Sequence, residues 1–87
     1  MWRVILHNDD RTTLDFLAEV AVRVFSRRQS DAASLLLKLY REGRAVAGIY
    51  PDLATAAAKV EAVRQMSQDT NSALIATFET IRRSEAA

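Results

Sequence analysis

The chain has 87 residues, a length that suits one small domain and is too short for two. Of these residues 49% are hydrophobic, which is enough for a single packed core. Its 12 basic and 11 acidic side chains leave a net charge of +1, which argues against a nucleic-acid binder because such domains carry a clustered basic excess. The absence of cysteine excludes disulfides and thiol chemistry, and no apolar stretch approaches the roughly 20 residues that span a bilayer. We therefore expect a cytoplasmic domain that binds neither nucleic acid nor membrane.

The first predicted strand and the first predicted helix enclose a polar bend. Residues 2–6 include the aromatic Trp2 and the β-branched Val4 and Ile5, as in a strand. Thr12, with Asp15 three residues later, has the spacing of a helix N-cap with a capping-box partner, and apolar residues recur at helical intervals over residues 13–26. The bend falls on Asn8, Asp9 and Asp10.

A second helix is expected at residues 31–42, between Ser30 as N-cap and Gly43 as a left-handed stop. Four apolar residues would share one face of this helix, while Leu35 and Leu37 would point elsewhere. The four are Ala32, Leu36, Leu39 and Tyr40.

The last part of the chain is predicted as strand, helix and strand. Residues 44–50 have the small and β-branched composition of a buried strand, and Gly48 within it indicates a bulge or a close backbone approach. Asp52 can cap a third helix over residues 53–68, and residues 74–78 form the last predicted strand.

The order strand, helix, helix, strand, helix, strand predicts an α+β fold in which three helices pack against a three-stranded antiparallel sheet. We expect one domain at residues 1–80 and a flexible C-terminal tail at residues 81–87. From the residues alone, the polar bend could be only a turn and a cap, and the leucines of the second helix could be only core.

Three blocks of the sequence resemble the ClpS family, the adaptors that hand N-degron substrates to the ClpAP protease. The first comprises residues 4–10 and 12–16, and the second, residues 39–50, resembles the family's helix end, glycine and central strand. The third comprises residues 59–60 and 74–79. The resemblance runs from Trp2 to Glu79 and implies the same fold in an adaptor that is not an enzyme and needs no cofactor or metal.

The resemblance also implies a ligand and the residues that hold it. An N-degron has a free α-ammonium that donates hydrogen bonds and a bulky first side chain, here Phe, Leu, Tyr or Trp, so its site needs acceptors beside an apolar pocket. The residues implied to hold the amine are Asn8, Asp9, Asp10 and Tyr40. The implied pocket residues are Thr12, Leu14, Leu17, Leu36, Leu39 and Leu74. Lys59 is implied to contact a partner, an unfoldase of the ClpA or ClpC type.

The sequence departs from the family pattern in four places. Tyr40 stands where the family usually has histidine, and Leu14 where many members have methionine. Residues 53–54 lack the glutamate that relatives use to bind the unfoldase, and seven residues precede Asn8 where relatives have a longer extension. A shortened sequence and a different mode of delivery are both open explanations for the last departure.

Other functions stay open on this evidence. The first alternative is a ClpS-like peptide-binding paralogue with altered N-terminal specificity, and the second is a generic protein-interaction domain. An enzyme would need a nucleophile with a base, yet the sole histidine is His7, on the first strand. Two carboxylates on a turn, Asp9 and Asp10, rarely suffice for a hard cation.

Overall fold

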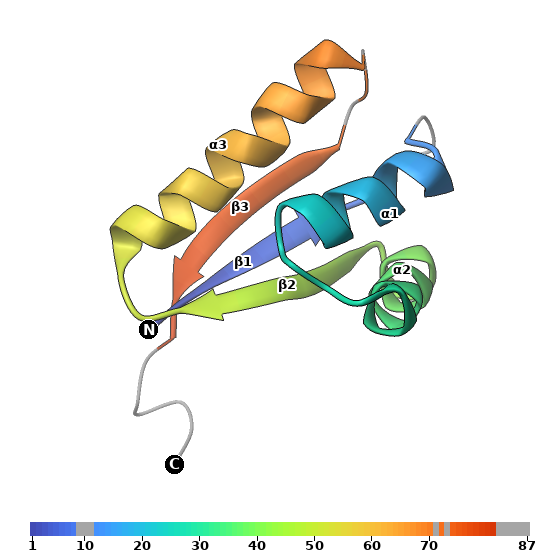
Figure 1. Ribbon diagram of the computed structural model, residues 1–87. Coiled ribbons are helices and arrows are strands. Elements are labelled where there is room, and N and C mark those ends of the chain that lie inside the picture. Colours follow the sequence, from blue (N-terminus) through green and yellow to red (C-terminus); the bar gives the residue numbers. More distant parts are fainter. Residues whose placement is uncertain (9–11, 71, 73, 82–87) are drawn as a thin grey trace.

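The computed structural model describes residues 1–8, 12–70, 72 and 74–81. Along the chain it has the elements β1 (Trp2–His7), α1 (Leu14–Arg23), α2 (Gln29–Glu42), β2 (Arg44–Tyr50), α3 (Leu53–Asp69) and β3 (Ile75–Thr80). The predicted element order and the α+β class are therefore confirmed (Figure 1). The expected tail from position 82 onward lies outside the described residues. Among the described helices, none is long and apolar enough to cross a membrane.

The sheet has the strand order β2-β1-β3, and β1 pairs antiparallel with both neighbours (Figure 1). The antiparallel sheet is confirmed, but the expectation that residues 44–50 form the central strand is wrong. The central strand is β1, in which Val4, Ile5 and Leu6 are all buried. The small residues of β2 are buried because helices cover one face of the strand, whereas Ile49 on its other face is exposed.

A bulge in β2 confirms the expectation raised by Gly48. Val4 pairs with Gly48 but Ile5 pairs with Val46, so Ala47 is an extra residue between them. The carbonyl oxygen of Ala47 instead accepts two hydrogen bonds from the Arg27 guanidinium, at 3.2 Å from Nε and 2.6 Å from Nη2. The bulge is therefore fixed by the segment that connects α1 to α2.

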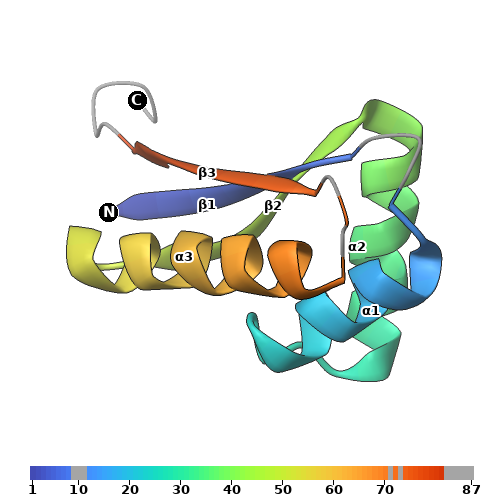
Figure 2. The ribbon, with the colours of Figure 1, turned by 90° about the horizontal axis from the view of Figure 1, so that it is seen from above.

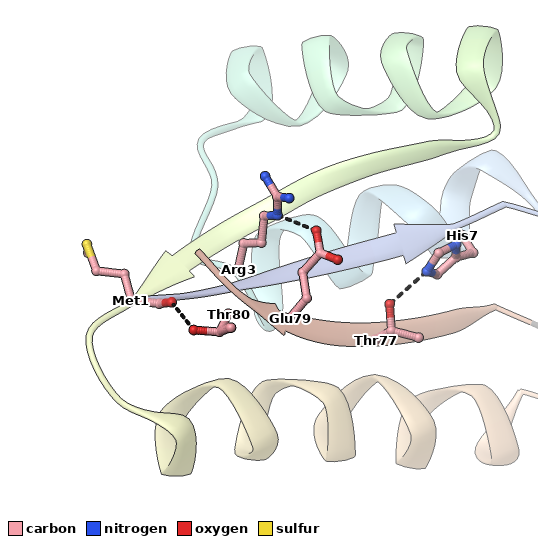
Figure 3. Close-up of polar contacts among 6 residues, drawn as sticks. All are labelled: Met1, Arg3, His7, Thr77, Glu79 and Thr80. Atoms are coloured by element: carbon pink, nitrogen blue, oxygen red, sulfur yellow. Dashed lines mark hydrogen bonds and ion pairs between the residues drawn. The ribbon is translucent and has the colours of Figure 1, made fainter. Parts of the chain in front are cut away.

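The helices cover one face of the sheet. Figure 2 shows α1 and α3 on the same side of the sheet, with α2 at the end where β1 stops and β2 starts. Val4, Leu6, Val20, Leu39 and Val63 are the largest fully buried side chains of the core between these layers. The opposite face carries polar pairs: an ion pair joins Arg3 to Glu79, and His7 Nε2 lies 2.8 Å from Thr77 Oγ1 (Figure 3).

The first helix begins one residue later than expected. Thr13, not Thr12, is the N-cap, and its Oγ1 accepts a hydrogen bond of 3.2 Å from the Phe16 N–H. Thr12 Oγ1 lies 3.2 Å from Ser72 Oγ, which ties the start of α1 to the segment before β3. Neighbouring threonines offer the same capping oxygen, so the sequence could not distinguish them.

The other helix ends are partly as predicted. α2 begins at Gln29, so Ser30 is not its N-cap, and Arg28 in the cap position makes no side-chain capping bond. Gly43 ends α2 with a φ of 77°, the left-handed stop that was expected. Asp52 caps α3 as predicted, because its carboxylate accepts from the Thr55 N–H at 2.7 Å.

Candidate functional site

The polar bend begins where β1 meets the C-terminal end of α2. The Asn8 N–H donates a 3.0 Å hydrogen bond to the Gly43 carbonyl, which holds these two chain segments together. The side-chain oxygen Oδ1 of Asn8 is buried and accepts no hydrogen bond from the described part of the chain. An unpaired buried acceptor costs about 1–3 kcal/mol, so a hydrogen-bond donor that reached this oxygen would be stabilising.

The end of α2 adds a favourable potential for a cation beside Asn8. The last carbonyl groups of a helix carry a partial negative charge because they lack helical partners. The Gly43 N–H satisfies the carbonyl of Leu39, and the charged side chains at this end of the helix, Arg41, Glu42 and Arg44, are exposed to solvent. The buried Asn8 oxygen and the helix end therefore favour the same kind of ligand group, a hydrogen-bond donor with positive charge.

The structure describes two of the four residues predicted to hold an amine. Asp9 and Asp10 lie outside the described residues, so their role stays a prediction. Tyr40 is 74% exposed, so the expectation that it shares one face of α2 with Ala32 and Leu39 is wrong, as is the expectation that Leu35 points elsewhere. The buried face is formed by Ala32, Leu35 and Leu39, and a rotation of about 100° per residue carries Tyr40 away from it.

Of the six predicted pocket residues, three are buried in the core and three are wholly or partly exposed. Leu17, Leu39 and Leu74 are at most 4% exposed and belong to the hydrophobic core. Leu36 packs against that core from the surface and Leu14 is 61% exposed. Thr12 is half-buried beside Ser72, as described above.

Leu14, Leu36 and Tyr40 come together in a surface groove between the start of α1 and the outer side of α2. Its volume is about 360 Å³ and its lining is completed by Ala33 and Leu37. The sequence reasoning missed these last two residues. Leu37 lies three residues before Tyr40, and Ala33 lies four residues before Leu37. This spacing was the available signal, because residues so spaced lie on one side of a helix.

Leu74 borders a second hollow as well as the core. This hollow, of about 640 Å³, lies between α3 and β3. Its lining includes polar side chains, among them Arg64, Gln68 and Ser72. The apolar groove between α1 and α2 is therefore the better match for a hydrophobic side chain.

Lys59, the predicted partner contact, lies within a network of its own protein. Its Nζ donates a 2.9 Å hydrogen bond to the Val24 carbonyl at the C-terminal cap of α1, and it lies 5.8 Å from the ring centroid of Tyr50. Burial raises the pKa of the Tyr50 phenol, an effect that the positive charge of Arg27 reduces. Lys59 thus links α3 to the end of α1, while its contact with an unfoldase stays a prediction.

Replacing Lys59 with methionine should lower the free energy of unfolding by about 1 kcal/mol, the net value of a typical intramolecular hydrogen bond. Methionine keeps the apolar stem but leaves the Val24 carbonyl without its donor. Urea denaturation of the variant, beside the exposed Lys38→Met on α2, measures this difference. Equal stability of both variants would show that water replaces the ammonium without cost.

Comparison with known proteins identifies the family to which this arrangement belongs. The family model described as "ATP-dependent Clp protease adaptor protein ClpS" matches residues 1–77. The chain belongs to the ClpS family. The resemblance seen in the sequence is thereby confirmed, whereas the roles of single site residues stay predictions.

Two curated relatives carry the name ATP-dependent Clp protease adapter protein ClpS. The one from Shewanella denitrificans is 35% identical over 79 residues, which cover 91% of this chain and 76% of the relative. The one from Acetivibrio thermocellus is 38% identical over 80 residues, which cover 91% of this chain and 79% of the relative. Family membership thus extends over nearly the whole chain.

A solved ClpS structure has the same fold. It is that of Agrobacterium tumefaciens ClpS2 bound to L-phenylalaninamide, with a TM-score of 0.84 and 24% sequence identity. The match covers 90% of this chain and 93% of that one. The arrangement of three helices and three strands is therefore the ClpS fold.

Proposed function

We propose that this chain binds proteins whose N-terminal residue is bulky and hydrophobic and delivers them to the ATP-dependent Clp protease through a ClpA-type or ClpC-type unfoldase. It acts in the cytoplasm as an adaptor and not as an enzyme, and it uses no cofactor. The observation that carries the proposal is the buried Oδ1 of Asn8, which accepts no hydrogen bond from the described residues and lies beside the C-terminal end of α2. Membership of the ClpS family supports it.

The N-terminus of a substrate complements this arrangement. Its α-ammonium has three donors, of which one satisfies Asn8 Oδ1 and the others are left for Asp9 and Asp10, the acceptors expected from the sequence. The partial negative charge at the end of α2 stabilises the cation. In the structure of Agrobacterium ClpS2, the bound molecule, L-phenylalaninamide, has both a free amine and an aromatic side chain.

The side chain of the substrate's first residue enters the apolar groove between α1 and α2 and supplies the rest of the affinity. Burial of a Leu or Phe side chain contributes about 1.5–3 kcal/mol, and each hydrogen bond to a charged group about 1.5–3 kcal/mol. The entropy lost on association offsets part of this gain. A dissociation constant in the micromolar range or tighter follows, on the order of 1 μM.

A panel of peptides that differ only in the first residue tests this proposal. We expect Phe, Leu, Tyr and Trp at the first position to bind, and Gly or Ser to bind at least about tenfold more weakly, because they bury less apolar area. Calorimetric titration gives each affinity directly. Equal binding of all peptides would mean that the first side chain is not recognised.

The exposed position of Tyr40 favours one alternative, a ClpS paralogue with altered N-terminal specificity. Tyr40 borders the groove and is 74% exposed, so its phenol oxygen lies at the surface and not over the core. From there it can accept a hydrogen bond from a polar first residue. Tighter binding of polar than of hydrophobic first residues in the same panel would establish this alternative.

A further inference from the structure

The strand β3 forms one edge of the sheet, because β1 is its one strand neighbour in the described part of the chain (Figure 1). The Ile81 N–H donates to the Met1 carbonyl, so Ile81 turns its backbone N–H towards β1. Backbone direction alternates along an antiparallel strand, and the register with β1 is regular over the whole of β3. Ala76, Phe78 and Thr80 therefore direct their N–H and C=O groups away from the sheet.

The other edge of the sheet, on β2, lacks such a regular row. The bulge at Ala47 interrupts it, and the Arg27 guanidinium occupies the Ala47 carbonyl. Bulges and covering side chains are devices that protect an edge from pairing with a further strand. The register of β3 has no bulge, and within the described residues no side chain donates to an outward carbonyl of this strand. The edge of β3 can therefore accept another strand.

A hollow of about 640 Å³ lies between this edge and α3. β3 contributes Ile75 and Ala76 to its lining, and α3 contributes Val60 and Arg64, the one charged side chain among the described lining residues. A strand added beside β3 presents every second side chain to the helix side of the sheet, where the hollow lies. Val60 favours an apolar side chain there. Arg64 favours an acidic one, because its bonds to Glu61 use only two of its five N–H donors.

We infer that the edge of β3 binds an extended segment of a partner protein as a fourth strand, with apolar residues and one acidic residue of that segment turned towards α3. The outward backbone groups favour an extended chain, because donors and acceptors at strand spacing are matched by another strand. The inference goes beyond the proposed function, since it involves neither Asn8 nor the groove between α1 and α2.

A second copy of this chain fits the edge less well than a segment of a different protein. In an antiparallel pair of β3 strands, the copy would turn Ala76, Phe78 and Thr80 towards α3, and none of these carries a charge. Its Glu79 would lie on the helix-free face, so Arg64 would gain no acidic partner. The copy would also bring its own α3 to the same side of the sheet. A separate extended segment has neither disadvantage.

The probe for this site is the peptide Thr-Val-Thr-Asp-Thr-Val-Thr, with an acetylated N-terminus and an amidated C-terminus. Its sequence reads the same in both directions, so it can present Val, Asp and Val to the helix side in either orientation. The blocked N-terminus keeps it from the amine site. In an NMR titration of the ¹⁵N-labelled protein at millimolar peptide, we expect the Phe78 and Thr80 amides to shift more than those of Val46 and Ile49 on the β2 edge.

Two N-methylated forms of the peptide test the backbone pairing. One is methylated at both valines and the other at the two inner threonines, so each form blocks a different alternate set of N–H groups. Only the set that faces β3 is needed for pairing. One form should therefore lose at least about tenfold in affinity, while the other keeps the affinity of the unmethylated peptide within about twofold.

Arg64→Glu tests the preference for an acidic residue. In the parent, replacing the aspartate of the peptide with lysine should weaken binding about fivefold, the scale of an exposed ion pair. Arg64→Glu should reverse this preference. Arg23→Glu is the matched control and should keep it, because Arg23 is exposed and also pairs with a glutamate of its own helix, Glu19. Circular dichroism of both variants confirms that the helices are intact.

The inference is overturned if the Phe78 and Thr80 amides do not shift, or if the two N-methylated forms bind equally well. It is also overturned if Arg64→Glu keeps the charge preference of the parent. A dimer of the protein alone in analytical ultracentrifugation, with Phe78 and Thr80 amides that shift on dilution, would assign the edge to a second copy instead. Failure of amine recognition would leave the inference standing, because the peptide has no free amine.

Discussion

Acetylation of the α-amino group should reduce the binding of a Phe-initiated or Leu-initiated peptide by a factor on the order of 100 or more. The modification removes the positive charge and leaves one amide N–H where the ammonium had three donors. Two lost hydrogen bonds to a charged group, at about 1.5–3 kcal/mol each, exceed the 1.4 kcal/mol that corresponds to tenfold. The carbonyl of the acetyl group would also come close to the buried Asn8 oxygen, itself an acceptor.

Fluorescence anisotropy with paired free and acetylated peptides measures this factor. The Asn8→Ala variant is the companion experiment: it should bind the free peptide more weakly by about 1.5–3 kcal/mol. Its folding stability should not fall, because the oxygen that it removes has no hydrogen-bond partner among the described residues and its burial costs free energy. If free and acetylated peptides bound the parent equally, the amine would not be recognised, and the groove would be a general apolar peptide site.

Leu39→Ala should lower the free energy of unfolding by about 2–5 kcal/mol, the range for a buried leucine truncated to alanine. Leu39 is 0% exposed and belongs to the core. The cost combines lost burial with a cavity that the surrounding side chains fill only partly. Because a small domain has about 5–15 kcal/mol of stability in total, this one change could remove a large share of it.

Leu37→Ala is the matched control, since it makes the same substitution two positions earlier on the same helix. Leu37 is exposed, so its truncation should change the stability by less than about 0.5 kcal/mol. Urea denaturation of both variants gives the two differences. If Leu39→Ala lost peptide binding while its unfolding curve matched the parent's, Leu39 would act mainly as a pocket residue and our assignment of it to the core would be wrong.

The element order could be predicted because its signals are local. Gly43 ends α2 in the left-handed conformation that favours glycine, and Asp52 caps α3 through a residue three positions ahead. The place of β2 at the edge of the sheet could not be predicted in this way. Strand order depends on which distant segments pair, and the composition of residues 44–50 suits an edge strand covered by helices as well as a central one.

The candidate site could be predicted only as far as its residues have individual signals. The polar character of Asn8 was visible in the sequence, but the burial of its side-chain oxygen, without a partner among the described residues, arises from the way β1 meets α2. Ala33 and Leu37 were missed because the groove exists only where α1 and α2 lie together. The outward position of Tyr40 follows from the choice of buried face, which a helix as rich in leucine as α2 leaves ambiguous.

The start of the central strand β1 lies beside the end of the outer strand β3, which has a practical consequence for work on this molecule. The Met1 carbonyl accepts a hydrogen bond of 3.4 Å from Thr80 Oγ1 (Figure 3). It also accepts one of 2.8 Å from the Ile81 N–H, so these residues are neighbours. The six residues of β1 separate this end from Asn8 by roughly 20 Å. A fluorophore or surface tether attached near Met1 or Ile81 would leave the amine site accessible. A short linker between the same two points would permit circular permutation, with new termini in a surface loop.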